Sequence, residues 1–487
     1  MRVRSLRSSD NESLAAPNAV PPSVSGLPAG GRGFPAGGPQ RTAPPIHGMH
    51  PMRKVLVFSA LMLVFCRISM LPEVLSFVYH VPSFIYYLLY SLAIAGMLMT
   101  GGLARLSQAG PFWAWMAFLG WMIVATPFSS WVGGSIEQLI TFLKGAGLML
   151  VILSCSFANW RECRGAMKGM ELGYLVLVIV SQFMNSDRGG RVSLSFGTIG
   201  NSNDLACHLL MALPAMLFIL MSSASRTFYR MAALLFVGWG LNIILGSASR
   251  GALVSLVCMG LFFLFFGPGR ARLMLIPVVI IGIFVAALFV QKSTTNRLMS
   301  MFSSEANAES AEAKASWEQR QLMIRNGFLF VQSHPLIGVG PGQFSDFNGK
   351  FGDQSGEQRT YWANAHNSYL AAAAETGIPG FLCYVAAFFM TFRTLWKTYR
   401  ATRHRQEAIF QDIRLASFCL LLGFLGFSIA IVFLNFTYLF HAPMLTGLAI
   451  CLSRAAQRAM GEANAAAGQP ALARPGWTMP TPTPRPA

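Results

Sequence analysis

Charged side chains are scarce in this sequence of 487 residues: only 11% are charged, whereas 54% are hydrophobic. In soluble globular domains about 25% of the residues are charged, so the composition excludes an ordinary soluble domain and indicates a polytopic membrane protein. Acidic residues are the scarcer kind, 19 against 37 Lys and Arg, and the formal net charge is +18. The tendency of cytoplasmic loops to carry Lys and Arg explains much of this excess. We therefore expect no nucleic acid partner.

Cysteine spacings that would form a disulfide framework or a zinc site are also absent. All eight cysteines lie in or beside apolar segments, and the long polar loop at residues 291–377 has none. No apolar run precedes Met52, so the sequence predicts no cleavable signal peptide. Residues 1–52 and 456–487 are rich in small residues and proline and contain too few large apolar side chains to form a core. We expect both to be disordered cytoplasmic tails.

Long apolar runs are what the sequence has in abundance. Runs of roughly 17 to 25 residues can cross a bilayer as helices, and we predict an all-α polytopic membrane protein with about twelve transmembrane helices. The predicted helices cover residues 54–71, 83–103, 111–128, 134–157, 169–185, 204–223, 229–246, 250–267, 272–290, 378–396, 413–434 and 436–453. Helices 1–9 form a membrane domain at residues 53–290, and helices 10–12 follow at residues 378–455.

The positions of Lys and Arg predict the orientation of the chain. With the N-terminus in the cytoplasm, 25 of the 37 Lys and Arg fall on the cytoplasmic side, in agreement with the positive-inside rule. Both termini are then cytoplasmic. Residues 291–377 form one large loop that faces outward.

A few arginines depart from this rule. Arg188 and Arg191 lie in the connection after the fifth predicted helix, and Arg250 lies in the tight turn between the seventh and the eighth. A charge at membrane depth costs on the order of 2.5 to 3.5 kcal/mol, so it is usually paired or functional. One alternative for Arg188 and Arg250 is an extended side chain that reaches the lipid headgroups. The only acidic neighbours are Asp187 and Asp204, which favours a bound diphosphate or another anion.

The outer loop contains a predicted amphipathic helix. Residues 316–319 have the form of a capping box, and apolar or long side chains follow at helical spacing until His334-Pro335. These side chains are Trp317, Gln321, Ile324, Phe328 and Val331. We expect the helix to lie on the membrane domain or the outer leaflet, with Arg320 as a candidate for phosphate contact. The alternative is a lid that only packs.

Three glycines and a proline follow within residues 338–342. Glycine-rich loops can bind phosphate through backbone amides. However, neither a strand nor a Lys-Ser or Lys-Thr pair accompanies this loop, as a P-loop would require. We therefore predict a tight turn that redirects the chain.

His366 is the central candidate for catalysis. If Asn364 caps the next helix, His366 lies in its first turn, where the helix dipole keeps the imidazole neutral. A neutral imidazole can accept a proton from a sugar hydroxyl. In the alternative, Asn367 or Ser368 is the cap and the histidine only precedes the helix. Glu375 falls at the far end of the same helix, where it can pair with an arginine instead of touching substrate.

Four stretches of the chain, taken together, resemble the O-antigen ligase and O-antigen polymerase superfamily. They are RVSLSFGTIGNSNDLA (191–206), GSASRGALVSL (246–256), HPLIGVGPGQF (334–344) and AHNSYLAAAAETGIPG (365–380). The resemblance spans roughly residues 55–453. One departure is Asn201-Ser-Asn203, where many members have Asn-Pro-Asn, and it weakens the alignment at Arg191 slightly.

This resemblance implies a metal-independent glycosyltransferase without a cofactor, in a bacterial inner membrane and with a periplasmic site. Its donor would be a glycan on undecaprenyl diphosphate. By residue-wise correspondence, Arg191, Arg250 and Arg320 would hold the diphosphate, and His366 would assist the acceptor hydroxyl in a single displacement with inversion. The supporting candidates are Arg188, Asn367 and Glu375. Carboxylates are not clustered on the outer side, which also argues against a required divalent metal.

Several alternatives stay open. The acceptor is lipid A core in a ligase, which we favour, the growing glycan in a polymerase, or a protein hydroxyl in an O-oligosaccharyltransferase. From another class, a lipid-linked sugar transporter often has two similar halves, but the sequence contains no such repeat and few intramembrane carboxylates. Lys144, inside the fourth predicted helix, would favour the transporter if it coupled protons or substrate.

Overall fold

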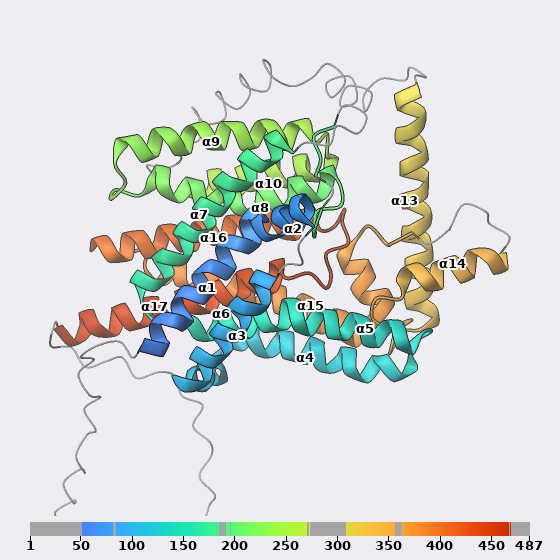
Figure 1. The fold of residues 1–487 in the computed structure, drawn as a ribbon, viewed down its shortest axis with the longest axis horizontal. Helices are drawn as coiled ribbons and strands as arrows, with labels where there is room; N and C mark the ends of the chain where they lie inside the picture. Colours follow the sequence, from blue (N-terminus) through green and yellow to red (C-terminus); the bar gives the residue numbers. More distant parts are fainter. Residues whose placement is uncertain are drawn as a thin grey trace, which may run out of the picture. The chain divides into compact units, whose positions relative to one another are not determined.

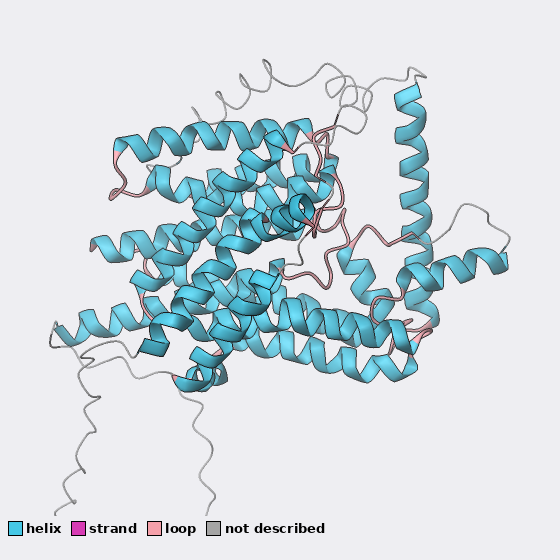
Figure 2. Cartoon of the chain, in the orientation of Figure 1, coloured by secondary structure: helices cyan, strands magenta, loops and turns pink. Residues whose placement is uncertain are grey.

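The structure is a computed structural model that describes residues 51–80, 84–184, 191–194, 196–269, 272, 308–355, 363–466 and 468. All named elements in these ranges are helices (Figure 1), and loops join them (Figure 2). One isolated bridge pairs Phe196 with Ile199. The prediction of an all-α protein is confirmed.

Seven helical segments of the described residues are long and apolar enough to cross a membrane. They are α4 with η2 (Gly110–Phe128), α5 with η3 and α6 (Val132–Ser156), α7 (Trp160–Phe183), α8 (Ser202–Met221), α9 (Thr227–Gly246), α15 (Ser368–Ala401) and α16 (Ala408–Ala430). Helices α1 (Pro51–Ser69) and α2 (Leu71–Tyr79) make an eighth candidate, although they are bent by 65°. A multi-pass membrane protein follows from these spans.

The remaining helices are shorter or more polar. They are α3 (Phe84–Met99), η1 (Gly102–Gln108), α10 (Arg250–Phe266), α13 (Ala308–Ser333), α14 (Phe344–Ser355) and α17 (His441–Ala466). All predicted transmembrane segments overlap described helices except 272–290, of which the structure describes only residue 272. The number twelve stays a prediction. Helix α17 continues to Ala466, and so extends into the range 456–487 that we expected to be a tail, because Ala455, Ala456 and Ala459 pack in the core.

The membrane helices pack closely through glycines. Helix α1 packs against α3 and α7, α16 against α8, and α15 against α4. A Cβ atom built at Gly96 of α3 would lie 2.9 Å from the Leu56 Cβ of α1, and one at Gly423 of α16 would lie 2.5 Å from the Met211 carbonyl oxygen of α8. Small residues of this kind let helix backbones approach one another in membranes.

Helices α13 and α14 form a smaller unit at one end of the bundle. Figure 1 shows α13 running across the direction of α4, α5 and α15, and α13 packs against α15. A second core, which includes Met323, Phe330 and Phe344, lies between these helices and α15. The presence of a helix in this part of the chain is therefore confirmed. It ends at Ser333 as expected and begins eight residues before Ser316.

Candidate functional site

His366 lies two residues before the start of α15. The side chain of Asn367 caps this helix, because its Oδ1 accepts hydrogen bonds from the backbone N–H groups of Tyr369 and Leu370, both at 3.0 Å. The prediction that Asn364 caps the helix is therefore wrong, and the alternative with Asn367 as the cap is confirmed. His366 adopts a left-handed conformation with φ of 47°. Such strained residues are concentrated at functional sites.

The surroundings of His366 favour the neutral form of its imidazole. Burial lowers its pKa from the ordinary 6.5, and the nearby positive charge of Arg320 lowers this pKa further. The sequence had suggested the same neutral state through the dipole of a first helical turn. The structure gives a different cause, since His366 lies outside that turn.

Arg320 lies near a second arginine. Burial lowers the pKa of Arg320, and the positive charge of Arg250 lowers it further. Neither guanidinium forms an ion pair with an acidic residue of the described chain. Two like charges repel at close range, so this pair favours the binding of an anion. Arg320 is thus close enough to influence the charge of His366 and is itself influenced by the charge of Arg250.

Arg191 lies along the turn that carries Arg250. Its Nε donates to the carbonyl oxygen of Ser247 at 2.8 Å, and its Nη2 donates to Asn203 Oδ1 at 3.0 Å. The next residue, Val192, donates its N–H to the Gly246 carbonyl oxygen at 3.1 Å. These contacts orient Arg191 beside the start of α10. Arg188 lies outside the described residues.

The turn between α9 and α10 is as tight as predicted. Only residues 247–249 separate the two helices, and Ser249 caps α10 by accepting from the N–H of Ala252 at 3.4 Å. Arg250 is the first residue of α10, and its side chain is exposed. An exposed guanidinium at a helix start can meet a ligand without rearrangement of the helix.

The Asn201-Ser-Asn203 turn also supports Arg191. Asn201 Oδ1 accepts from the N–H groups of Asn203 and Asp204 at 2.9 and 3.1 Å. Asp204 in turn bonds to the residue before Asn201, since its Oδ2 accepts from the Gly200 N–H at 3.0 Å. Asn201 therefore caps α8, and the side chain of Asn203 is left to accept from Arg191.

Helix α13 buries a different face from the one that its apolar pattern suggests. Met323, Asn326 and Phe330 are buried, whereas Ile324 and Phe328 of the predicted stripe are 40% and 59% exposed. A buried hydrogen bond of 2.9 Å from Asn326 Nδ2 to Asn348 Oδ1 fixes α13 against α14. At a spacing of three to four residues, Arg320 shares the buried face.

Glu375 supports the glycine-rich turn instead of pairing with an arginine. Its carboxylate is buried and accepts from the N–H groups of Gly342 and Phe344 at 2.9 and 3.1 Å, and from the Tyr438 hydroxyl at 2.5 Å. The predicted tight turn is therefore confirmed. Gly377 ends the first part of α15 with φ of 68°, and a Cβ there would lie 2.3 Å from the Leu336 carbonyl oxygen.

The sequence interpretation missed the connection between α16 and α17, residues 431–440. It left one residue there between two helices, but the structure has a loop that bonds to Ser368. Asn435 and Thr437, polar residues within an apolar run, were the available signal.

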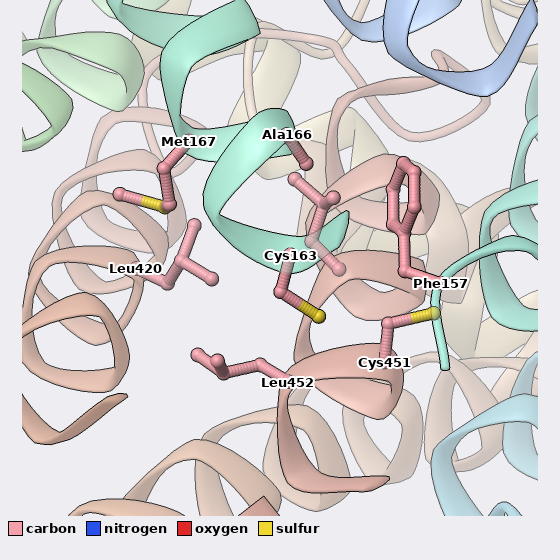
Figure 3. A pocket seen from close by; sticks show the side chains of 8 residues that line it. Phe157, Cys163, Ala166, Met167, Leu420, Cys451 and Leu452 are labelled. Carbon is pink, nitrogen blue, oxygen red and sulfur yellow. The ribbon is translucent and has the colours of Figure 1, made fainter. Parts of the chain in front are cut away.

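Other polar groups belong to separate clusters. Arg67 pairs with Glu73 at 3.4 Å and lies 3.9 Å from the centroid of the Tyr86 ring. His441 is buried and lies 3.0 Å from His208. A small cavity beside Cys163 and Cys451 is lined by apolar side chains and thiols (Figure 3), which do not suit a glycan or a diphosphate.

The fold and the site define a class: a multi-pass helical membrane protein in which a histidine lies near Arg320, and neither Arg320 nor Arg250 has an acidic partner among the described residues. Residues 232–385 match the family model described as O-Antigen ligase. This match confirms the resemblance of the chain to the O-antigen ligase superfamily, whose members are glycosyltransferase-like enzymes, and it includes Arg250, Arg320 and His366. No curated protein matches the chain.

Proposed function

We propose that this protein transfers a glycan from undecaprenyl diphosphate to an acceptor hydroxyl, with lipid A core as the favoured acceptor. The reaction takes place at the periplasmic face of the bacterial inner membrane. One observation carries the proposal: the neutral imidazole of His366 lies near Arg320, which in turn lies near Arg250. A base next to two cations suits a reaction in which a hydroxyl loses a proton while a diphosphate leaves.

The proposed step is a single displacement. The acceptor oxygen forms a bond to the anomeric carbon as the bond from that carbon to the diphosphate oxygen breaks. The hydroxyl proton passes to His366, and the electron pair of the broken bond leaves with undecaprenyl diphosphate. Attack from the opposite side inverts the anomeric carbon, and the step needs no metal ion.

The arginines would stabilise the leaving group. Negative charge grows on the diphosphate in the transition state, and preorganised cations stabilise it there more than in the ground state. Arg250 and Arg320 face this charge in the proposal. Arg191, oriented by Ser247 and Asn203, would bind the same diphosphate from the side of α9 and α10.

A transfer assay with a matched histidine control tests the role of His366. The full chain, purified in lipid nanodiscs, receives a lipid-linked glycan and a defined acceptor. We expect His366→Ala to lower the transfer rate by about 10²–10⁴-fold, the usual contribution of general base catalysis. His334→Ala replaces an exposed histidine of the same outer unit and should leave the rate unchanged. Full activity of His366→Ala would contradict the proposed base.

The acceptor requires a separate experiment. Deletion of the gene, followed by gel analysis of the surface polysaccharide, separates the alternatives. Long chains that are no longer attached to lipid A core indicate a ligase. Single repeat units on the core indicate a polymerase, and a normal pattern would direct attention to a protein acceptor.

A further inference from the structure

We propose that the connection between α16 and α17, specifically residues 431–438, is a positioning element that fixes His366 relative to Arg250. Phe433 of this loop and Ser368, the first residue of α15, are the two positioning residues. The inference rests on the proposed function for the roles of His366 and Arg250. Neither Ser368 nor Phe433 touches the reacting atoms in this proposal.

Ser368, two residues after His366, is bonded to this loop through all of its polar groups. Its N–H donates to the Ile431 carbonyl oxygen at 2.9 Å, and its hydroxyl donates to the Leu434 carbonyl oxygen at 2.7 Å. The same hydroxyl oxygen accepts from the Phe436 N–H at 2.7 Å, and the Ser368 carbonyl oxygen accepts from Thr437 Oγ1 at 3.0 Å. Ser368 is fully buried. The start of α15, and with it His366, therefore follows the position of the loop.

Two tyrosines extend this attachment along α15. The Tyr369 hydroxyl donates to the Ser428 carbonyl oxygen at 3.0 Å, on the last turn of α16. The Tyr438 hydroxyl donates to Glu375, two turns further along α15. The loop is thus held against α15 at both of its ends, which limits sliding of one element past the other.

Phe433 connects the same loop to the arginine side of the site. A Cβ built at Gly251 would lie 2.7 Å from Phe433 Cδ2 and 2.9 Å from Phe433 Cβ, so the absence of a side chain at Gly251 is what admits Phe433. Gly251 directly follows Arg250 in α10. A displacement of Phe433 would therefore be transmitted to the first turn of α10.

These contacts place the loop of residues 431–438 between His366 and Arg250, which lie far apart in the sequence. Helix α16 packs against both α10 and α15, and the loop continues this bridge beyond the end of α16. Leu434, Phe436 and Thr437 are buried, so the bridge has little freedom to move. Displacement of a catalytic group by 1 Å can cost on the order of 100-fold in rate, which gives such a bridge a catalytic consequence.

The test compares Ser368→Ala with Ser368→Thr in the full chain in nanodiscs. Transfer rate is one readout. The other is the pKa of His366, obtained from the pH dependence of diethylpyrocarbonate modification and quantified on the His366 peptide by mass spectrometry. We expect Ser368→Ala to lower the turnover on the order of 100-fold, with a nearly unchanged KM for the lipid-linked donor, and to move the pKa of His366 upward toward 6.5. Ser368→Thr keeps the hydroxyl. Its turnover and its pKa of His366 should therefore be close to those of the wild type.

Ser417→Ala is the matched control. Ser417 is also buried, and its hydroxyl donates only to the Ile413 carbonyl oxygen within α16. It should leave both readouts within twofold of the wild type. Phe433→Ala is a second test of the positioning role, because it removes the contact with Gly251 without breaking a hydrogen bond. It replaces Ser368→Ala in this test if Ser368→Ala does not fold.

The positioning role is overturned if Ser368→Ala and Phe433→Ala both leave the pKa of His366 and the turnover within twofold of the wild type. It is also overturned if Ser417→Ala changes them equally, since that result indicates general destabilisation. The pKa readout needs no transfer activity. A wild-type chain without transfer, in which Ser368→Ala still shifts the pKa of His366, would reject the proposed function and retain the positioning role.

Discussion

In the proposed mechanism, Arg320 and His366 have opposite requirements for charge. Arg320 has to be cationic to stabilise a diphosphate, and His366 has to be neutral to accept a proton. The positive charge of Arg320 meets both requirements, because it also disfavours protonation of the nearby His366 imidazole and lowers the pKa of that group. In the proposed mechanism, the pair therefore couples diphosphate binding to the deprotonated state of the base.

This coupling predicts the pH dependence of transfer. A base acts only when it is deprotonated, so the wild-type rate should fall with decreasing pH only below 6.5, where the lowered pKa of His366 lies. Arg320→Gln removes the positive charge, so the pKa of His366 rises and the fall begins at a higher pH. Burial, the larger cause of the shift, remains in this variant. The measurement is kcat/KM against pH, which reports groups of the free enzyme.

Arg320→Lys is the control for this pH prediction. It keeps the positive charge, so its rate should fall over the same pH range as the wild type even if its maximal rate is lower. If Arg320→Gln and the wild type lost activity over the same pH range, Arg320 would have no influence on the catalytic base.

The sequence points to the candidate site residues, whereas it does not show the contacts of the residues that support them. Arginines in connections predicted to face outward, and a histidine in the outer loop just before α15, are visible in the sequence itself. Ser368, Asn203 and Glu375 act through partners that lie far away in the sequence or on another helix, such as Leu434, Arg191 and Tyr438. Only the folded chain brings these partners into contact.

Helix α13 illustrates the same limit for whole elements. Apolar spacing predicted the helix correctly, but the buried face is set by the Asn326–Asn348 hydrogen bond and by Gly327, where a Cβ would lie 2.7 Å from Leu370 Cδ2. Periodicity identifies a stripe of apolar residues. It does not decide which side of a membrane-associated helix faces protein.

Two phenylalanines of α13 test its observed rotation. Phe330 is 1% exposed and Phe328 is 59% exposed. Replacement of a buried phenylalanine by alanine costs about 3–5 kcal/mol, so Phe330→Ala should strongly increase amide hydrogen exchange in α13 and α14. Phe328→Ala should change it little. Equal effects, or a larger effect of Phe328→Ala, would mean that α13 buries the stripe originally predicted from the sequence.

At the level of the whole molecule, the proposed site would be assembled from segments near residues 191, 250, 320 and 366, which belong to different helices and connections. The fold class and most helices followed from hydrophobic runs, because a bilayer imposes a minimum length. The bent pair α1 and α2 and the loop after α16 did not, since apolar runs continue through both.

Lys144 bears on the transporter alternative. It lies in η3 (Leu143–Gly147), a π-helical turn in the middle of the Val132–Ser156 span, and its side chain is exposed. Ionisable residues that couple ions or substrates in transporters almost always face the interior of the bundle or a water-filled cavity. The outward position of Lys144 therefore does not support a coupling role.

The orientation of the chain decides whether the site can meet a periplasmic donor. We predict that Lys350→Cys, in α14, reacts with a membrane-impermeant maleimide on intact spheroplasts, whereas Glu462→Cys, in α17, reacts only after permeabilisation. The two side chains are 54% and 66% exposed, so access to the reagent is limited by the membrane and not by packing. Native cysteines give little background, since six are buried and two are partly buried. The reverse pattern would place His366 in the cytoplasm, where the proposed transfer to a periplasmic acceptor could not occur.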